Sequence, residues 1–337
     1  MFCPYCGFDH DDATKTSSEH VIPYAMGGSN DFTIVVCELS NNQLGGQVDR
    51  PIIEFFPVRS ERFFLGLNGT DGTPPTLDMS GVTYLQGREM QLRNVLGPDG
   101  KDTRITSREI ERIPMGESER WNMKGSPEAI RKALAGKIRD QASKGKWVKN
   151  DRGEIITLEN LDQILQEVTE EIPNPCVLRK IEFDYLWTRR FFAKIALAIG
   201  HYLFGESFSR SKRADELRRT MQAPTMDETG IKGAVVFPDT HALPPLAARF
   251  KTQGAHTIIV SHGRPRLLTI SLFGWLDACL ALDEIRDGER MVVGHIEIIE
   301  ITLPDRALSK YSLHDYMRLR ALRERSSPQP GDGQTSA

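Results

Sequence analysis

Three of the five cysteines of this chain lie within its first 37 residues, and two of these three form a Cys-x-x-Cys pair. The three are Cys3, Cys6 and Cys37, whereas Cys176 and Cys279 stand alone. An odd total with a cluster at one end argues against a disulfide framework and favours a metal-binding knuckle in a reducing compartment. We therefore expect a cytoplasmic protein whose N-terminal region folds around these thiols.

The composition of the 337 residues is that of an ordinary globular protein, with 39% hydrophobic and 26% charged residues. A chain of this length can form two or three domains, each with its own core. The net charge of −3 gives no general attraction to nucleic acid, so such contacts must come from local basic patches. We expect no contact with a membrane, because the most apolar stretch, residues 191–204, contains Lys194 and His201.

The spacing of apolar and turn-forming residues predicts an α+β fold in four parts. These parts are a motif-rich N-terminal domain at 1–57, a mixed β and helical accessory region at 58–180, an α+β C-terminal domain at 181–323 and a disordered tail at 324–337. Helical spacing predicts helices at 126–145, 158–171, 183–203 and 211–221. Alternating or β-branched runs predict antiparallel strands at 234–237, 256–260, 266–272 and 292–303, with a hairpin loop at 263–265.

Three short motifs in the N-terminal region contain the residues that are suited to catalysis and metal binding. They are Cys3-Pro4-Tyr5-Cys6-Gly7, Ser18-Glu19-His20-Val21-Ile22-Pro23 and Cys37-Glu38-Leu39-Ser40-Asn41-Asn42. At these positions the chain resembles the HNH endonuclease family, in the branch that reads C-x-x-C-G, E-H-[VI]-I-P, G-G and C-x-x-C-N in order. Gly27-Gly28 stands where that branch has its glycine pair, and Gly46-Gln47-Val48-Asp49 is similar to the stretch that continues its last helix. The resemblance implies a ββα-metal nuclease module at the N-terminus.

The resemblance also implies roles for three side chains: His20 as general base, and Glu19 and Asn41 as ligands of Mg²⁺ or Mn²⁺. The residue types suit this chemistry, because a neutral imidazole accepts a proton from water near neutral pH, and a hard cation prefers carboxylate and amide oxygens. An isolated Glu-His pair is more often an ordinary surface or core pair. Its order and spacing with Cys37 and Asn41 favour the catalytic interpretation.

Two positions depart from the family pattern. The fourth zinc ligand is expected three residues after Cys37, where this chain has Ser40, a poor ligand for Zn²⁺. Either the structural zinc site formed by Cys3, Cys6 and Cys37 is lost, or His10 completes it, or packing and hydrogen bonds hold the knuckle together. The residue that orients the base should lie five positions before Cys37, where this chain has Phe32. Asn30 and Asp31 are close enough in sequence to replace it.

A basic stretch between residues 124 and 149 is the strongest candidate for contact with a nucleic-acid backbone. Its representative residues are Lys132, Arg139, Lys144 and Lys146. Such a cluster gives salt-dependent affinity without sequence preference. The competing interpretation is a solvated helix face, which is what most charge runs are.

The sequence therefore predicts an endonuclease that hydrolyses DNA phosphodiester bonds with Mg²⁺ or Mn²⁺, and a structural Zn²⁺ remains an open alternative. DNA as the partner, and a role in defence against phage or other foreign DNA, rest on the resemblance alone. A homodimer is left open. The alternative function is a degenerate HNH-like module that binds DNA or protein without cleaving it. Retention of Glu19, His20 and Asn41 argues against that alternative.

Overall fold

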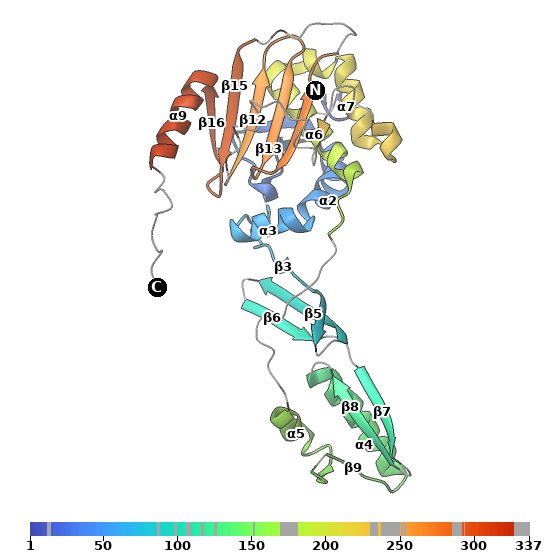
Figure 1. The fold of residues 1–337 in the computed structure, drawn as a ribbon. Coiled ribbons are helices and arrows are strands. Elements are labelled where there is room, and N and C mark those ends of the chain that lie inside the picture. The colour runs from blue at the N-terminus through green and yellow to red at the C-terminus, as the bar shows by residue number, and fades with distance from the viewer. Residues whose placement is uncertain are drawn as a thin grey trace. The chain divides into compact units, whose positions relative to one another are not determined.

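The computed structural model describes residues 1–11, 15–85, 88–97, 100–105, 109–115, 118–124, 127–150, 152–168, 181–229, 235–236, 250, 252, 254–284, 292 and 294–326. Two compact units make up the chain (Figure 1). The first contains Met1–Pro75 together with Phe183–Ala337, and the second contains Thr76–Glu182. The sequence predicted a separate domain at 1–57, whereas in the structure these residues share one unit with the C-terminal part of the chain.

The first unit begins with a β-hairpin followed directly by helices. Strand β1 (Thr16–His20) pairs antiparallel with β2 (Thr33–Cys37), so that Glu19 lies opposite Ile34 and His20 opposite Thr33. Helix α1 starts at the residue after β2. The chain then continues as α1 (Glu38–Leu44), a π-helical turn (Gly45–Asp49), α2 (Arg50–Ile53) and α3 (Phe56–Phe64). We call Met1–Phe64 the N-terminal module.

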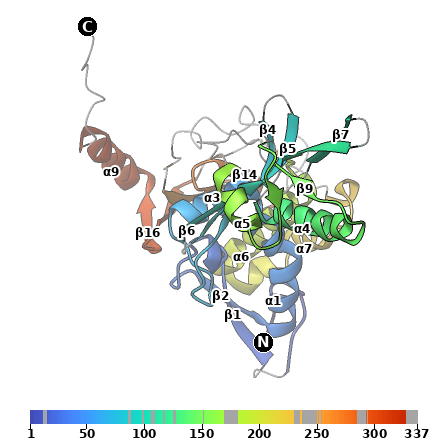
Figure 2. The ribbon, with the colours of Figure 1, turned by 90° about the horizontal axis from the view of Figure 1, so that it is seen from below.

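A six-stranded antiparallel sheet forms the C-terminal half of the same unit. Its strand order is β11 (Val235–Val236), β14 (Leu276–Ala281), β13 (Leu267–Leu272), β12 (Ala255–Ser261), β15 (Ile296–Thr302) and β16 (Ala307–Ser312). The final helix α9 (Leu313–Ser326) follows the edge strand β16 and lies beside that edge in both ribbon views (Figures 1 and 2). The predicted strands at 256–260, 266–272 and 292–303 are found, while β14 and β16 were not expected. The predicted tail lies outside the described residues from 327 onward.

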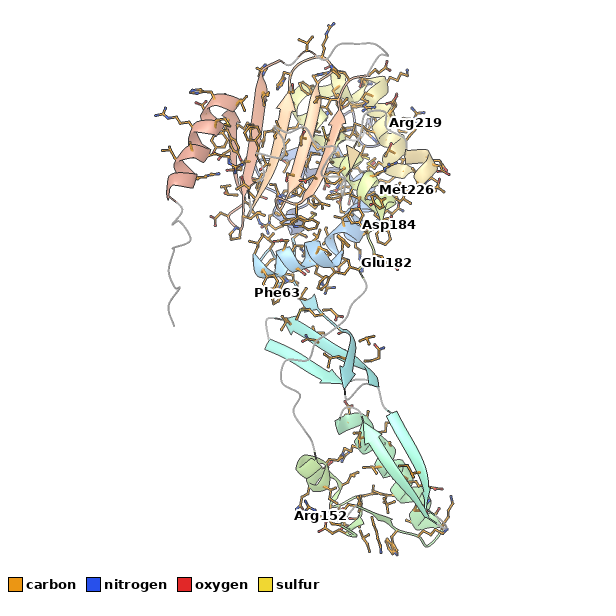
Figure 3. The ribbon with its side chains drawn as sticks, viewed as in Figure 1. Phe63, Arg152, Glu182, Asp184, Arg219 and Met226 are labelled. Carbon is orange, nitrogen blue, oxygen red and sulfur yellow. The ribbon has the colours of Figure 1, made fainter. Side chains whose placement is uncertain are left out.

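Two helices and the N-terminal module pack against this sheet. Helix α6 (Tyr185–Ser209) is capped by Asp184, whose Oδ1 accepts from the backbone N–H groups of Leu186 and Trp187 at 2.8 and 3.1 Å (Figure 3). Every residue from Phe191 to Gly200 is buried, so this helix is surrounded by protein. It passes the predicted end at 203 and reaches Ser209 through a kink at Gly205. Helix α7 (Lys212–Gln222) then packs along it.

One hydrophobic core joins the module, α6 and the sheet. It contains Val21 and Val36 of the module, Ile195 of α6 and Ile258 and Leu272 of the sheet. A core shared in this way explains why residues 1–57 do not form a unit of their own. The prediction of an α+β fold with antiparallel sheets is confirmed.

The second unit has its own smaller core. Strands β3 (Leu77–Asp78), β4 (Gly81–Leu85), β5 (Arg88–Gly97) and β6 (Gly100–Ile105) form one sheet, β7 (Glu109–Met115) and β8 (Ser118–Lys124) form a hairpin, and β9 (Val148–Lys149) pairs with β10 (Ile155–Ile156). Helices α4 (Pro127–Ser143) and α5 (Leu161–Val168) pack through Ile138, Leu161 and Leu165. Within the described part of the chain, no helix is both long enough and apolar enough to span a bilayer.

Candidate active site

Two of the predicted catalytic residues, Glu19 and His20, lie at the end of strand β1. Side chains alternate along a strand, so Ser17 and Glu19 share one face of β1, whereas His20 points to the other. The strand ends at His20, and the glycine pair explains how the chain turns there. A Cβ atom on Gly28 would lie 1.8 Å from the carbonyl oxygen of Ile22, so only glycine permits this close approach.

His20 is held by Asn30. Its Nε2 lies 3.0 Å from Asn30 Oδ1, and the ring of Tyr24 packs 5.2 Å from the His20 ring. An amide oxygen can only accept a hydrogen bond, so Nε2 carries the proton and Nδ1 keeps its lone pair. Asn30 thus contacts the imidazole, although the family pattern places the orienting residue two positions later, at Phe32. Phe32 at that position is buried against Tyr202, with ring centroids 4.7 Å apart.

Glu19 belongs to a buried charge triad. The ammonium group of Lys194 on α6 donates to Glu19 Oε1 and to Asp49 Oδ2. The side chain of Lys194 is 1% exposed, that of Asp49 7% and that of Glu19 12%. Two carboxylates and one ammonium leave a net charge of −1 in this pocket, and Asp49 Oδ1 is buried without a hydrogen-bond partner among the described residues.

Burial and the neighbouring charges shift the pKa values of this triad. Loss of hydration raises the pKa of Asp49 to about 6, against the opposing attraction of Lys194. Burial alone would lower the pKa of Lys194, but the two carboxylates outweigh it and the pKa is raised. Lys194 is therefore charged at neutral pH, and it neutralises part of the acidic charge that surrounds it.

Asn41 reaches the same face of β1 as Glu19. Its Nδ2 donates to Ser17 Oγ at 2.6 Å, and this bond turns the amide oxygen away from Ser17. Because Ser17 and Glu19 are neighbours on one face, the structure brings the two predicted ligand residues to that face. His20 instead turns toward Asn30 and Tyr24, where it lines an open cleft of about 470 Å³.

The cysteine knuckle gathers four groups that could hold a metal. One ligand atom from each of Cys3, Cys6, His10 and Cys37 lies within 4.8 Å of the others, and Cys6 Sγ is 3.2 Å from His10 Nε2. Three thiols and one imidazole form a donor set that zinc accepts in structural sites. The Cys37 thiol donates instead to Ser40 Oγ at 3.1 Å. Ser40 thus contacts Cys37, while His10 supplies the fourth candidate donor.

Helices α6 and α7 hold this knuckle from outside. Arg218 Nε donates to the carbonyl oxygen of Pro4 at 2.8 Å. Arg210 pairs with Asp9 at 2.6 Å and stacks 4.1 Å from the centre of the Phe2 ring. Both arginines make these contacts with the N-terminal module. They therefore have a structural function in this fold.

The predicted nucleic-acid-binding residues lie in the second unit. Lys132 and Arg139 are exposed on α4, and Lys144 and Lys146 are exposed just beyond the end of that helix. Lys144 pairs with Asp140 at 2.7 Å, which reduces its free charge. The remaining cations are accessible to a phosphate backbone, and their role stays a prediction.

Sequence reasoning did not assign a role to Lys194 or Asp49. Lys194 is 175 residues from Glu19 in the chain, so no local motif could connect them. A signal was nevertheless present, because a single lysine interrupts the most apolar helix of the chain. A lysine at such a position is stable only when it meets a buried acid.

Comparison with known protein families identifies the N-terminal region. Residues 3–57 match the model of the HNH endonuclease family, and this range covers the knuckle, the hairpin, α1 and α2. The predicted resemblance and the predicted strand-strand-helix module are therefore confirmed. No curated protein and no solved structure matches the chain. The match of residues 3–57 to this family model points to interaction with nucleic acid and to a nuclease or DNA-binding function.

Proposed function

We propose that the chain is a metal-dependent endonuclease that hydrolyses DNA phosphodiester bonds, with His20 as the general base. The observation that carries this proposal is the hydrogen bond from His20 Nε2 to Asn30 Oδ1 at 3.0 Å. This bond fixes the tautomer and leaves Nδ1 free to take a proton from water. A histidine oriented in this way, inside an HNH module, supports catalysis.

Glu19 and Asn41 would hold Mg²⁺ or Mn²⁺. Their donor set fits a hard cation, because the Asn41 amide oxygen is turned away from Ser17 and the triad keeps a net negative charge with one buried carboxylate oxygen unpaired. When bound, such a cation would neutralise charge that develops on the phosphate. Asn30 would orient the His20 ring with Nδ1 free, and Lys194 would hold the Glu19 carboxylate in one position.

Cys3, Cys6, His10 and Cys37 would hold a structural Zn²⁺. Burial alone would raise the pKa of Cys37, but its hydrogen bonds with Ser40 and with the neighbouring cysteines lower it. A lowered pKa favours the thiolate, which is the form that binds zinc. A zinc ion here would fix the start of the chain against α1, which carries Asn41.

A second candidate function is a non-catalytic HNH scaffold that binds DNA or protein. The observation that favours it is the ion pair between Glu19 and the ammonium of Lys194, which occupies one oxygen of the predicted metal ligand. Under this alternative the module would bind its partner without hydrolysis. The two candidates differ in whether replacement of His20 changes a measured reaction.

A plasmid-nicking assay tests the proposal. Supercoiled DNA is incubated with the full chain and Mg²⁺ or Mn²⁺, and the wild type is compared with His20→Ala. The control is His314→Ala, which removes a histidine whose side chain is 87% exposed on α9. We expect cleavage by the wild type and by the control, and a loss of about a hundredfold or more in His20→Ala. Cleavage that survives in His20→Ala, or DNA binding without cleavage under either metal, would support the scaffold instead.

DNA rather than RNA, and defence against phage DNA, complete the proposal and rest on the HNH resemblance. Comparing cleavage of DNA and RNA strands of equal sequence tests the first. Comparing phage plating on cells that express the wild type or His20→Ala tests the second. The exposed cations Lys132, Arg139, Lys144 and Lys146 of the second unit would add affinity for the phosphate backbone.

A further inference from the structure

We propose that Arg306 is a phosphate-binding residue of the cleft beside His20, supplied by the C-terminal sheet. This inference rests on the proposed function, because it names the substrate group that the cleft receives. Arg306 lies in the turn that connects β15 to β16, far in sequence from the HNH module. Together with His20, Tyr24 and Asn30 it lines the cleft of about 470 Å³, a size that suits a small ligand or a segment of a larger one.

The contacts of Arg306 place its guanidinium group at the N-terminal module. The guanidinium carbon lies 3.4 Å from the centre of the Tyr24 ring, and Nη2 donates to the carbonyl oxygen of Asn68 at 3.2 Å. Tyr24 also packs against His20. One aromatic ring thus separates the proposed base from the guanidinium, and both groups line the same cleft.

The charge balance of the cleft favours an anion. Among the described residues that line it, Arg306 is the one arginine or lysine, and no carboxylate lines it. Arg306 forms no ion pair with the residues that the structure describes, and its Nη1 is shielded without a hydrogen-bond partner among them. A guanidinium group offers five N–H donors, so donors remain for a ligand after the bond to Asn68. A phosphate group accepts such donors in pairs.

The backbone at Arg306 supports a role for this side chain. Its φ angle is +60°, a left-handed conformation that favours glycine. Arginine at such a position costs conformational energy, and observed outliers of this kind are found at functional sites. Gly66, Gly69 and Gly72 also line the cleft.

The experiment measures DNA binding as a function of salt, with Ca²⁺ in place of Mg²⁺ to prevent cleavage. A short duplex is titrated with wild type, Arg306→Met, Arg306→Gln and the control Arg318→Met, an exposed arginine on α9. Arg306→Gln removes the charge but keeps an amide that can donate to Asn68. We expect both Arg306 variants to bind about tenfold to a hundredfold more weakly at low salt. We also expect the slope of log K against log salt to decrease in magnitude by about 0.9.

A purely structural role would lower the melting temperature and leave the salt slope of the folded fraction unchanged, and that result would overturn the inference. An unchanged affinity in both variants would overturn it as well. The proposed function can fail separately: a wild type that binds DNA but never cleaves it would refute the nuclease, while the slopes still decide Arg306. Conversely, if the wild type cleaves DNA and the Arg306 variants show the same salt slope as the wild type, only the proposed role of Arg306 is refuted.

Discussion

Removal of the buried ammonium of Lys194 should destabilise the first unit strongly. In Lys194→Met the carboxylates of Glu19 and Asp49 lose their shared partner while both stay largely shielded from water. Breaking a buried ion pair on one side costs about 3–5 kcal/mol, since a buried charge is left without compensation. For a unit of this size each kcal/mol lowers the melting temperature by about 2–4 °C, so we expect a decrease of roughly 6–20 °C.

The assay is thermal unfolding followed by circular dichroism, with urea unfolding to obtain the free energy. Lys212→Met is the matched control, because Lys212 pairs with Glu284 at 3.1 Å while its side chain is 74% exposed. An exposed pair contributes about 0–1 kcal/mol, so this variant should melt close to the wild type. A second comparison uses a triple variant that combines Lys194→Met with Glu19→Gln and Asp49→Asn. Neutral groups replace the whole triad in this variant, which should recover much of the lost stability.

The pH dependence gives an independent check. The pKa of Asp49 is about 6 in the folded protein, above its unfolded value, and removal of Lys194 should raise it further. Because its pKa is raised on folding, Asp49 binds a proton more tightly in the folded state than in the unfolded state. The loss of unfolding free energy in Lys194→Met should therefore be smaller at pH 5 and larger at pH 8. If Lys194→Met melts within 2 °C of the wild type, or if its deficit is independent of pH, the triad does not carry this energy.

Three further predictions follow from the other contacts. His256 is fully buried, Nδ1 accepts from the N–H of Phe273 at 3.2 Å and Nε2 donates to the carbonyl oxygen of Met26 at 2.7 Å. Burial lowers its pKa to about 4, so stability present above the unfolded pKa of about 6.5 should fall by about 3 kcal/mol between pH 7 and pH 4, as measured by urea unfolding. His256→Gln should flatten that dependence, and an equal loss in the variant would contradict it. Metal analysis should find one zinc per chain in the wild type and in Ser40→Ala but less in His10→Ala, and equal zinc in all three would exclude His10 as a ligand. Asn30→Asp should favour the protonated imidazolium of His20 and move the acidic limb of the pH–rate profile to higher pH, whereas an unmoved profile would show that Asn30 does not tune His20.

Local patterns predicted much of the secondary structure. The proline, acid and apolar spacing at the start of α4 and the long apolar run of α6 have clear periodicity, and both helices are found. Strand β14 was missed because Leu276–Ala281 is short and buried along its whole length, which removes the alternation that identifies a half-exposed strand. Edge strand β16 was missed because it is mostly polar and partly exposed.

The candidate site was predictable only where its residues are close in sequence. Spacing brought Cys37 and Asn41 into one motif and suggested His10, and Asn30 or Asp31, as replacements for absent family residues. The structure places His10 at the thiols and Asn30 at His20. Lys194 and Arg306 reach the module from the C-terminal part of the chain. Their positions follow from tertiary packing, and a single sequence carries no pairing information over such distances.

The N-terminal module depends on the rest of its unit for its structure. Its hairpin residues belong to a core shared with α6 and the sheet, Lys194 neutralises Glu19 and Asp49, and Arg218 holds the backbone of the knuckle. A fragment of residues 1–64 would expose this core surface and leave two acids unpaired. The fragment would then bury too little apolar surface to offset the conformational entropy that the chain loses on folding, even if zinc binds. We therefore expect the isolated fragment to lack dispersed amide signals in NMR spectra with or without zinc, while residues 1–75 joined to 183–337 should fold. A folded, dispersed spectrum of the fragment alone would show that the module is autonomous.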